Sequence, residues 1–237
     1  MEFNNYVQKV IKDNYSLRKL VQKYYAAFPE LFYDENPSED VCLEAVKEDG
    51  KLLAFIEHQT GGVCLAAVKQ AGLALGYVKE QTPEICLAAV RQDWYALQYV
   101  KEQTPEICLA AVRQDWNALR SVKEQTPEIC LTAIRQNGYA LLHVKRQTPE
   151  ICLAAVKQDG YALQYVKDQT TEICLAAVKQ DGWALRYVEK QTSEICLAAV
   201  RNDPKAIRFV KSEFKEACKK EIEKMKSKHS LKYADTF

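Results

Sequence analysis

Cysteine is the residue whose type and spacing most clearly suggest chemistry in this sequence. Nine cysteines recur at 22-residue intervals from Cys42 to Cys218, and the chain has no others. Zinc sites usually pair cysteines two to four residues apart. Stacked helices lie about 8–10 Å apart, whereas a disulfide needs Cα atoms within roughly 7 Å. An apolar helix face also raises a thiol pKa, so we expect buried, reduced and unreactive thiols.

The other potentially catalytic groups form no constellation. The three histidines, His58, His143 and His229, occupy different positions relative to the nearest cysteine. The sequence contains neither a glycine-rich phosphate loop nor a nucleophile elbow. We therefore expect no catalytic residue, no cofactor, no metal site and no enzymatic activity.

Basic side chains recur with the same period as the cysteines. With the cysteine of each copy numbered zero, position +5 is Lys or Arg in all eight copies, and position +15 is Lys in six. Such a ladder could follow a phosphate backbone. The alternative is a solvated face, since Glu at −2 and frequent acids at +16 largely neutralise these columns. The candidate phosphate contacts are Arg91, Arg113, Arg135, Lys101, Lys123 and Lys145.

The positions that vary between copies form a second candidate surface. Position +8 holds Trp94 and Trp116 in adjacent copies, and an exposed tryptophan is typical of interface hot spots. The alternative is that aromatic residues here, and above all those at +9 and +13, pack between neighbouring copies. The +9 aromatics are Tyr95, Tyr139, Tyr161 and Trp183. The predicted partner-binding residues are Trp94, Gln98, Trp116, Arg120, Leu142 and Arg186.

Each 22-residue copy predicts two short antiparallel helices that position these side chains. Residues 82–103 read TPEICLAAVRQDWYALQYVKEQ. Thr is a good N-cap and Pro suits the first helical position, so we predict helix A over about 83–92. Asp at +7 would cap helix B over about 94–102. Because +8 accommodates Gly, Trp and Pro, a left-handed turn is excluded there.

In an α-helical helix B, positions +8, +12 and +15 would share one side, since residues three and four apart are neighbours. Both helices are under 12 residues and are marginal alone, so they must be stabilised by stacking. The sequence therefore predicts an all-α fold: an α-solenoid of eight 22-residue helix-turn-helix repeats between N- and C-terminal helical caps.

The predicted divisions follow the repeat. Residues 1–37 form an N-terminal helical cap, residues 38–213 the repeats, and residues 214–237 a degenerate half-repeat with a basic cap helix and tail. The repeats begin at residues 38, 60, 82, 104, 126, 148, 170 and 192. Atypical ends are expected of an array because its last repeats must present a polar outer face.

The words ALxYV and ExCLAAV(K/R)Q(D/N)G, as in residues 162–182, resemble an uncharacterised tandem-repeat family associated with large DNA viruses, protists and some bacteria. The resemblance covers roughly residues 38–211. It implies the repeat fold and its register, and it implies no activity, because that family has none established. Trp94 and Trp116 depart from the glycine that the pattern has at +8.

Composition narrows the functional classes. A net charge of +1 argues against a strongly polyanionic partner. The first residues lack the apolar core of a signal peptide, and no apolar run reaches the roughly 18 residues of a membrane span. Reduced cysteines imply an intracellular, cytoplasmic protein.

We expect a non-enzymatic scaffold that binds an unidentified protein or peptide through helix B, with the chain monomeric or weakly self-associating. The alternatives are nucleic-acid binding along the Lys/Arg ladders and a self-assembling structural protein.

Overall fold

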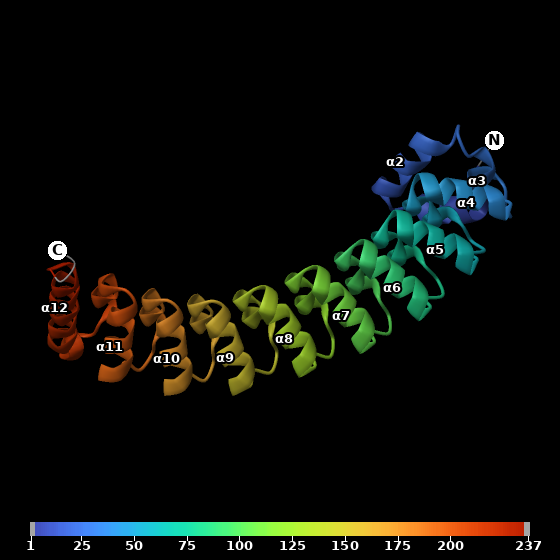
Figure 1. Ribbon diagram of the computed structural model, residues 1–237. Coiled ribbons are helices and arrows are strands. Elements are labelled where there is room, and N and C mark those ends of the chain that lie inside the picture. The colour runs from blue at the N-terminus through green and yellow to red at the C-terminus, as the bar shows by residue number, and fades with distance from the viewer. Residues whose placement is uncertain (1–2, 235–237) are drawn as a thin grey trace. The chain divides into compact units, whose positions relative to one another are not determined.

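The computed structural model describes residues 3–234, with side chains for residues 3–227. Every regular element in this part of the chain is a helix, so the predicted all-α class is confirmed. The chain divides into two compact units, Met1–Glu124 and Gln125–Phe237, and each contains four repeats. In each unit the helices of successive repeats lie side by side as an α-solenoid (Figure 1).

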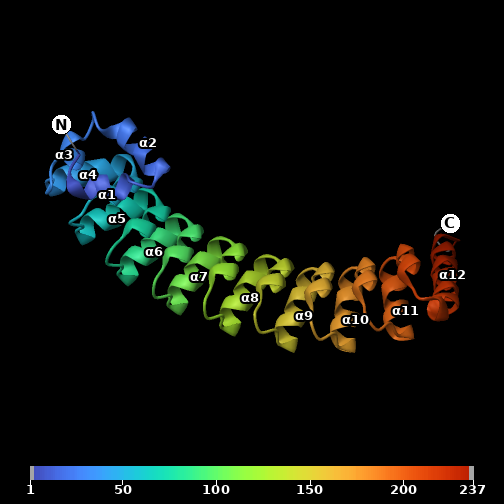
Figure 2. The same ribbon diagram turned by 180° about the vertical axis from the view of Figure 1, so that it is seen from behind.

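Unit 1 begins with the three helices of its cap and continues with four pairs of helices. Its elements are α1 (Asn5–Ile11), α2 (Tyr15–Tyr24), α3 (Pro29–Tyr33), α4 (Glu39–Glu48), η1 (Gly50–Phe55), α5 (Gly61–Gln70), η2 (Gly72–Tyr77), α6 (Pro83–Gln92), η3 (Trp94–Tyr99), α7 (Pro105–Gln114) and η4 (Trp116–Ser121). Helix α3 contacts α4 and α1 contacts η1, so the cap lies on the first repeat (Figure 2).

Unit 2 has four pairs of helices and a longer terminal helix. Its elements are α8 (Pro127–Gln136), η5 (Gly138–His143), α9 (Pro149–Gln158), η6 (Gly160–Tyr165), α10 (Thr171–Gln180), η7 (Gly182–Tyr187), α11 (Ser193–Asn202), η8 (Pro204–Phe209) and α12 (Ser212–Ala234). Helix α12 packs on α11 and includes Cys218, which is fully buried.

Helix A of every repeat has the predicted bounds and the predicted cap. In α7, for example, the Thr104 hydroxyl accepts from the Ile107 N–H at 3.3 Å, and Pro105 is the first helical residue. The cysteine, the alanine at +3 and the residue at +4 are buried in all eight repeats. All nine cysteines are free and buried, which confirms the interpretation of their spacing.

Helix B differs from the prediction. It is a six-residue 3-10 helix that ends at +13, as in η3, and not an α-helix reaching residue 102. Asp93 caps it as expected, its carboxylate accepting from the Tyr95 N–H, and no described residue has a positive φ. Val100 is already extended, because the chain must turn back toward the next helix A. The expected shared face of +8, +12 and +15 is therefore wrong: Lys101, at +15, lies beyond the helix, and a 3-10 helix aligns residues three apart.

A glutamine at position −5 hydrogen-bonds to the backbone at the end of helix B in the second to the eighth repeat. The Gln103 Oε1 accepts from the Lys123 N–H at 2.9 Å, and its Nε2 donates to the Ser121 and Leu97 carbonyls at 3.0 and 3.2 Å. The Cys108 thiol donates to the same Oε1, with the sulfur 3.6 Å away. One side chain thus forms hydrogen bonds with the backbone of two successive B helices and with the cysteine thiol. We call it the −5 glutamine, and its copies are Gln59, Gln81, Gln103, Gln125, Gln147, Gln169 and Gln191.

Glycine at +8 permits close approach of the next repeat. A Cβ added to Gly160 would lie 2.7 Å from the Ala177 carbonyl oxygen, and the Gly160 N–H donates to the Gln180 side chain at 2.7 Å. Trp94 occupies the same position in the third repeat, where Gln114 of the next helix A donates to the Arg91 carbonyl. At Gly72 of the same unit, the corresponding Gln92 instead accepts from the Gly72 N–H at 2.6 Å and donates to the Gln70 carbonyl, so this contact differs at Trp94.

We predict that Gln103→Ala lowers the free energy of unfolding by about 2 kcal/mol, because it leaves part-buried backbone groups without partners. The control is Gln98→Ala in the same repeat. Its exposed amide donates only to the Tyr95 carbonyl, at 3.2 Å, so its loss should change stability by less than about 0.5 kcal/mol. Guanidinium titration measures both. Equal stability of the two variants would contradict the role assigned to the −5 glutamine.

Candidate binding surface

The B helices of each unit present an unusual surface, formed by positions +8, +9, +12 and +13 of η1 to η4 in unit 1 and of η5 to η8 in unit 2. We call it the helix-B surface of that unit. None of these eight helices contains Asp or Glu. Positions +10 and +11 are mostly buried in the core. The four remaining positions therefore carry aromatic, aliphatic, amide and basic groups.

In unit 1, three of these side chains form a cluster. The Trp94 and Tyr95 ring centroids are 4.2 Å apart. The Arg120 guanidinium, from the next repeat, lies 4.9 Å from the Tyr95 ring and 5.6 Å from the Trp94 ring, and it donates to the Tyr95 hydroxyl. This stacking holds a cation against two rings. Two of the predicted residues, Trp94 and Arg120, are thereby brought together, and Tyr95 joins them.

The tryptophans are less exposed than their predicted role as open hot spots implies. Trp94 and Trp116 are both half-buried. On the neighbouring positions of η3, the rings of Tyr95 and Tyr99 are each 42% exposed. Gln98 is also exposed. The accessible part of this region therefore lies at +9, +12 and +13.

In unit 2, the +9 aromatic of one repeat packs edge-on against the +13 aromatic of the next. The ring centroids are 5.6 Å apart for Tyr139 and Tyr165, and 5.7 Å for Tyr161 and Tyr187. This confirms packing as the role of these +9 and +13 rings. The pattern changes in the fourth repeat, in unit 1, where Ser121 takes the +13 position.

The remaining predicted contacts lie on unit 2. Leu142, at +12, is 56% exposed, a high value for a large apolar side chain. Arg186, also at +12, lies 5.1 Å from the Tyr187 ring. The six predicted residues thus divide between the units, with four in unit 1 and two in unit 2.

The two basic columns lie at opposite ends of helix A. Arg91 belongs to the last turn of α6, whereas the charge of Lys101 acts on Cys86 in its first turn. A ten-residue helix is roughly 15 Å long, so one phosphate backbone cannot follow both columns of a repeat closely. Arg113 and Arg135 share the position of Arg91 in their own repeats.

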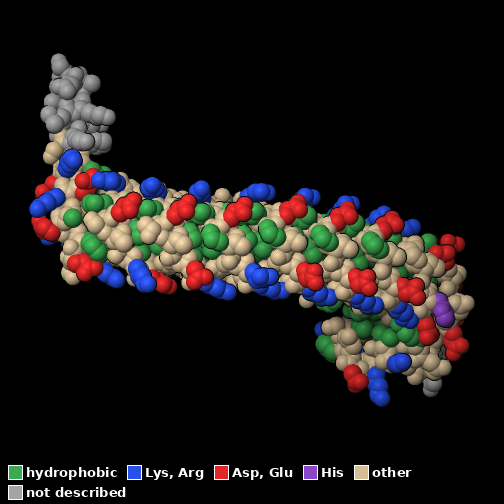
Figure 3. Space-filling view, turned by 90° about the horizontal axis from the view of Figure 1, so that it is seen from below, with side chains coloured by type: hydrophobic (Ala, Val, Ile, Leu, Met, Phe, Trp, Pro, Cys, Tyr) green, Lys and Arg blue, Asp and Glu red, His purple; other side chains and the backbone are tan. Residues whose placement is uncertain are grey.

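The +15 lysines of unit 1 also have a structural role. The Lys101 ammonium donates to the Lys79 carbonyl at 2.7 Å, and that of Lys123 donates to the Lys101 carbonyl at 2.8 Å. Lys145 occupies the equivalent position in unit 2. Figure 3 shows acidic and basic side chains interleaved along both edges of each unit, with hydrophobic and uncharged groups between them. This mixing weakens any single-sign field.

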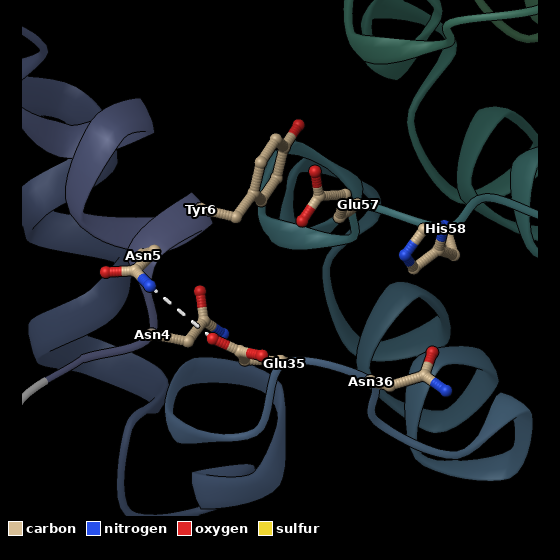
Figure 4. A pocket seen from close by; sticks show the side chains of 7 residues that line it. All are labelled: Asn4, Asn5, Tyr6, Glu35, Asn36, Glu57 and His58. Carbon is tan, nitrogen blue, oxygen red and sulfur yellow. Dashed lines mark hydrogen bonds between the residues drawn. The ribbon is translucent and has the colours of Figure 1, made fainter.

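A polar cavity of about 550 Å³ lies in unit 1 between the cap and the first repeats. Tyr6, Glu35, Glu57 and His58 line it, and Asn5 donates to Glu35 at 3.4 Å (Figure 4). His143 is at +13 of η5, and the side chain of His229 lies outside the described ones. Among the described residues, no group of three or more His, Cys, Asp or Glu side chains is placed to hold a metal ion.

Burial raises the pKa of every cysteine thiol above its ordinary value. It raises those of Cys174 and Cys196 to about 11, with smaller contributions from Glu189 and from Cys218 and Glu213, respectively. Each thiol also donates to a −5 glutamine, at 3.6 Å for Cys174 and 3.4 Å for Cys196. A thiol held protonated in this way is a poor nucleophile.

Sequence reasoning missed the −5 glutamine and the role of Tyr95. The glutamine left a signal, since a polar residue that is constant in seven successive repeats must satisfy a fixed set of partners. The +9 pattern includes Tyr95 but does not predict its pairing with Arg120, and the repeat that supplies Arg120 has Ser121 at +13 in place of a ring.

The stacked helix pairs and their uniform register define an α-solenoid repeat protein. No described helix is both long and apolar enough to cross a membrane. The chain belongs to the family described as Domain of unknown function (DUF4116), whose model matches residues 82–126, 126–171, 148–191 and 171–215. No curated protein and no solved structure matches the chain. The family match confirms the resemblance to an uncharacterised repeat family.

The raised thiol pKa values predict a loss of stability at alkaline pH. Between pH 9.0 and about 11 the unfolded chain ionises its thiols while the folded chain keeps them protonated, so the free energy of unfolding should fall across this window. Guanidinium titrations at several pH values measure it. In the variant Cys174→Ala with Cys196→Ala, the free energy of unfolding should fall less over this pH range than in the unaltered chain. An identical fall would contradict the role assigned to these thiols.

Proposed function

We propose that this protein is a non-enzymatic scaffold that binds a protein or peptide through the helix-B surface. The cluster of Trp94, Tyr95 and Arg120 carries the proposal. Tryptophan, tyrosine and arginine are the residues most enriched at interface hot spots. They meet here at +8, +9 and +12, three positions that vary along the repeats.

The constant positions support this division of roles. Helix A, the −5 glutamine and the aspartate at +7 are occupied by capping and stacking, which leaves them little freedom to recognise a partner. Repeat proteins typically bind ligands on an extended surface formed by successive repeats. Reduced cysteines agree with a partner inside the cell, in the cytoplasm.

The scaffold proposal predicts that removing the cluster abolishes partner recovery. The purified full chain would serve as bait in an extract of its native cell, alongside Trp94→Ala with Arg120→Gln. We expect the variant to recover its bound protein at least about tenfold less well, as expected when hot-spot side chains are truncated.

The matched control is Leu87→Ala with Arg91→Ala, which removes one apolar and one basic side chain from helix A of the same repeat. This control should recover the partner as the unaltered chain does. Circular dichroism must show all three proteins equally folded. Equal recovery by the cluster variant and the unaltered chain would overturn the proposal.

A further inference from the structure

The last two B helices of unit 2 carry a pair of stacked guanidinium groups. Arg208 of η8 lies 5.5 Å from the Trp183 ring and 5.5 Å from the Phe209 ring. Arg186 of η7 lies 5.1 Å from the Tyr187 ring and 5.9 Å from the same Phe209 ring. Trp183 and Phe209 pack edge-on, with centroids 5.4 Å apart. The two arginines thus flank one aromatic group.

Neither guanidinium has a hydrogen-bond or ion-pair partner among the described side chains. The nearby carboxylates are committed to other donors. Asp181 accepts from the Trp183 N–H at 2.8 Å, and Asp203 accepts from the Lys205 N–H at 2.8 Å and from the Trp183 indole at 2.6 Å. Both arginine side chains are exposed. Their planar N–H edges therefore remain available while their faces are held by the rings.

We propose that Arg186 and Arg208, with Lys205 beside them, form a receptor for the carboxylates of an acidic peptide segment. The inference rests on the proposed scaffold function, for which it specifies a class of partner. A guanidinium fork matches a carboxylate with two parallel hydrogen bonds. Stacking reduces the side-chain freedom that binding would otherwise cost.

Charge complementarity selects the acidic peptide. The four B helices of unit 2 contain Arg186, Lys205, Arg208 and His143 but no Asp or Glu. Single-stranded nucleic acid would need open ring faces on which its bases could stack. At this site guanidinium groups lie over the rings, and neighbouring aromatics pack against Phe209, so the accessible groups are the hydrogen-bond donors.

The repeat spacing sets the spacing of the recognised acids. Equivalent residues of stacked helices lie roughly 8–10 Å apart. A polyproline II segment rises about 3.1 Å per residue with three residues per turn, so every third side chain lies on one side, about 9 Å from the last. A peptide with glutamate at every third position therefore presents carboxylates at the period of Arg186 and Arg208.

Fluorescence anisotropy of the labelled peptide (Glu-Pro-Pro)4 with the full chain at about 0.15 M salt, where exposed charges are screened within about 8 Å, tests the inference. Arg186→Gln with Arg208→Gln should weaken binding about tenfold or more, as expected for two lost charge-assisted contacts. Arg186→Lys with Arg208→Lys keeps the charge but loses the fork, and should give an intermediate affinity.

The control is Lys157→Gln with Lys179→Gln, which removes the same charge from the +5 column of the same unit. It should weaken binding less than about twofold, because these exposed cations are largely screened. Melting curves of the arginine and control variants establish that they are folded.

Three results would each overturn the inference. The peptide does not bind, the two arginine-to-glutamine and the two lysine-to-glutamine substitutions weaken its binding equally, or oligodeoxythymidine binds more tightly than the peptide. In any of these cases, Trp94→Ala with Arg120→Gln can still recover less protein from the cell extract than the unaltered chain does. The scaffold proposal then stands and only the acidic-peptide site fails. If protein recovery does not depend on the cluster of Trp94, Tyr95 and Arg120, but the peptide binds through Arg186 and Arg208, the cluster proposal fails and the acidic-peptide site stands.

Discussion

The hydrogen bonds of the −5 glutamine are the interaction on which the rest of the array depends. Its carbonyl oxygen accepts from a backbone N–H of one repeat, and its amide donates to carbonyls of two successive B helices. Neither a ten-residue α-helix nor a six-residue 3-10 helix is stable alone in water. The extended segment between repeats has few backbone partners of its own, so the glutamine supplies them. From the second repeat to the eighth, the cysteine thiol donates to that glutamine, as Cys108 does to Gln103.

The constant positions have structural roles in every repeat, and this explains where the variable residues lie. A side chain that completes a cap or pairs a carbonyl in every repeat cannot change without cost. Positions +9 and +12 are open to change because they project from a 3-10 helix whose buried side is formed by +10 and +11, and the buried residue at +14 follows this helix. At Trp94, an aromatic and basic cluster with Tyr95 and Arg120 takes the place of the regular ring pairs.

Much of the fold follows from the sequence, and less of the surface does. The Thr-Pro start, the capping aspartate and the 22-residue period determined the bounds of helix A and the start of helix B. The end of helix B was missed because Val100 and the residues after it have a helix-compatible pattern. Gln81 accepts from the Lys101 N–H and donates to the Tyr99 carbonyl, which holds this segment extended. The repeat period places Trp94 and Arg120 on neighbouring B helices. It does not predict their contact with Tyr95, which occurs where Ser121 takes the +13 position of the next repeat.

Site-specific photocrosslinking tests most directly the claim that recognition lies on the helix-B surface. Benzoylphenylalanine would replace Gln98 in one sample and Arg91 in another, both exposed in the same repeat. After irradiation in native-cell extract, we predict a discrete adduct with the partner from position 98 and none from position 91. An adduct from position 91 alone, or equal adducts from both, would contradict the account.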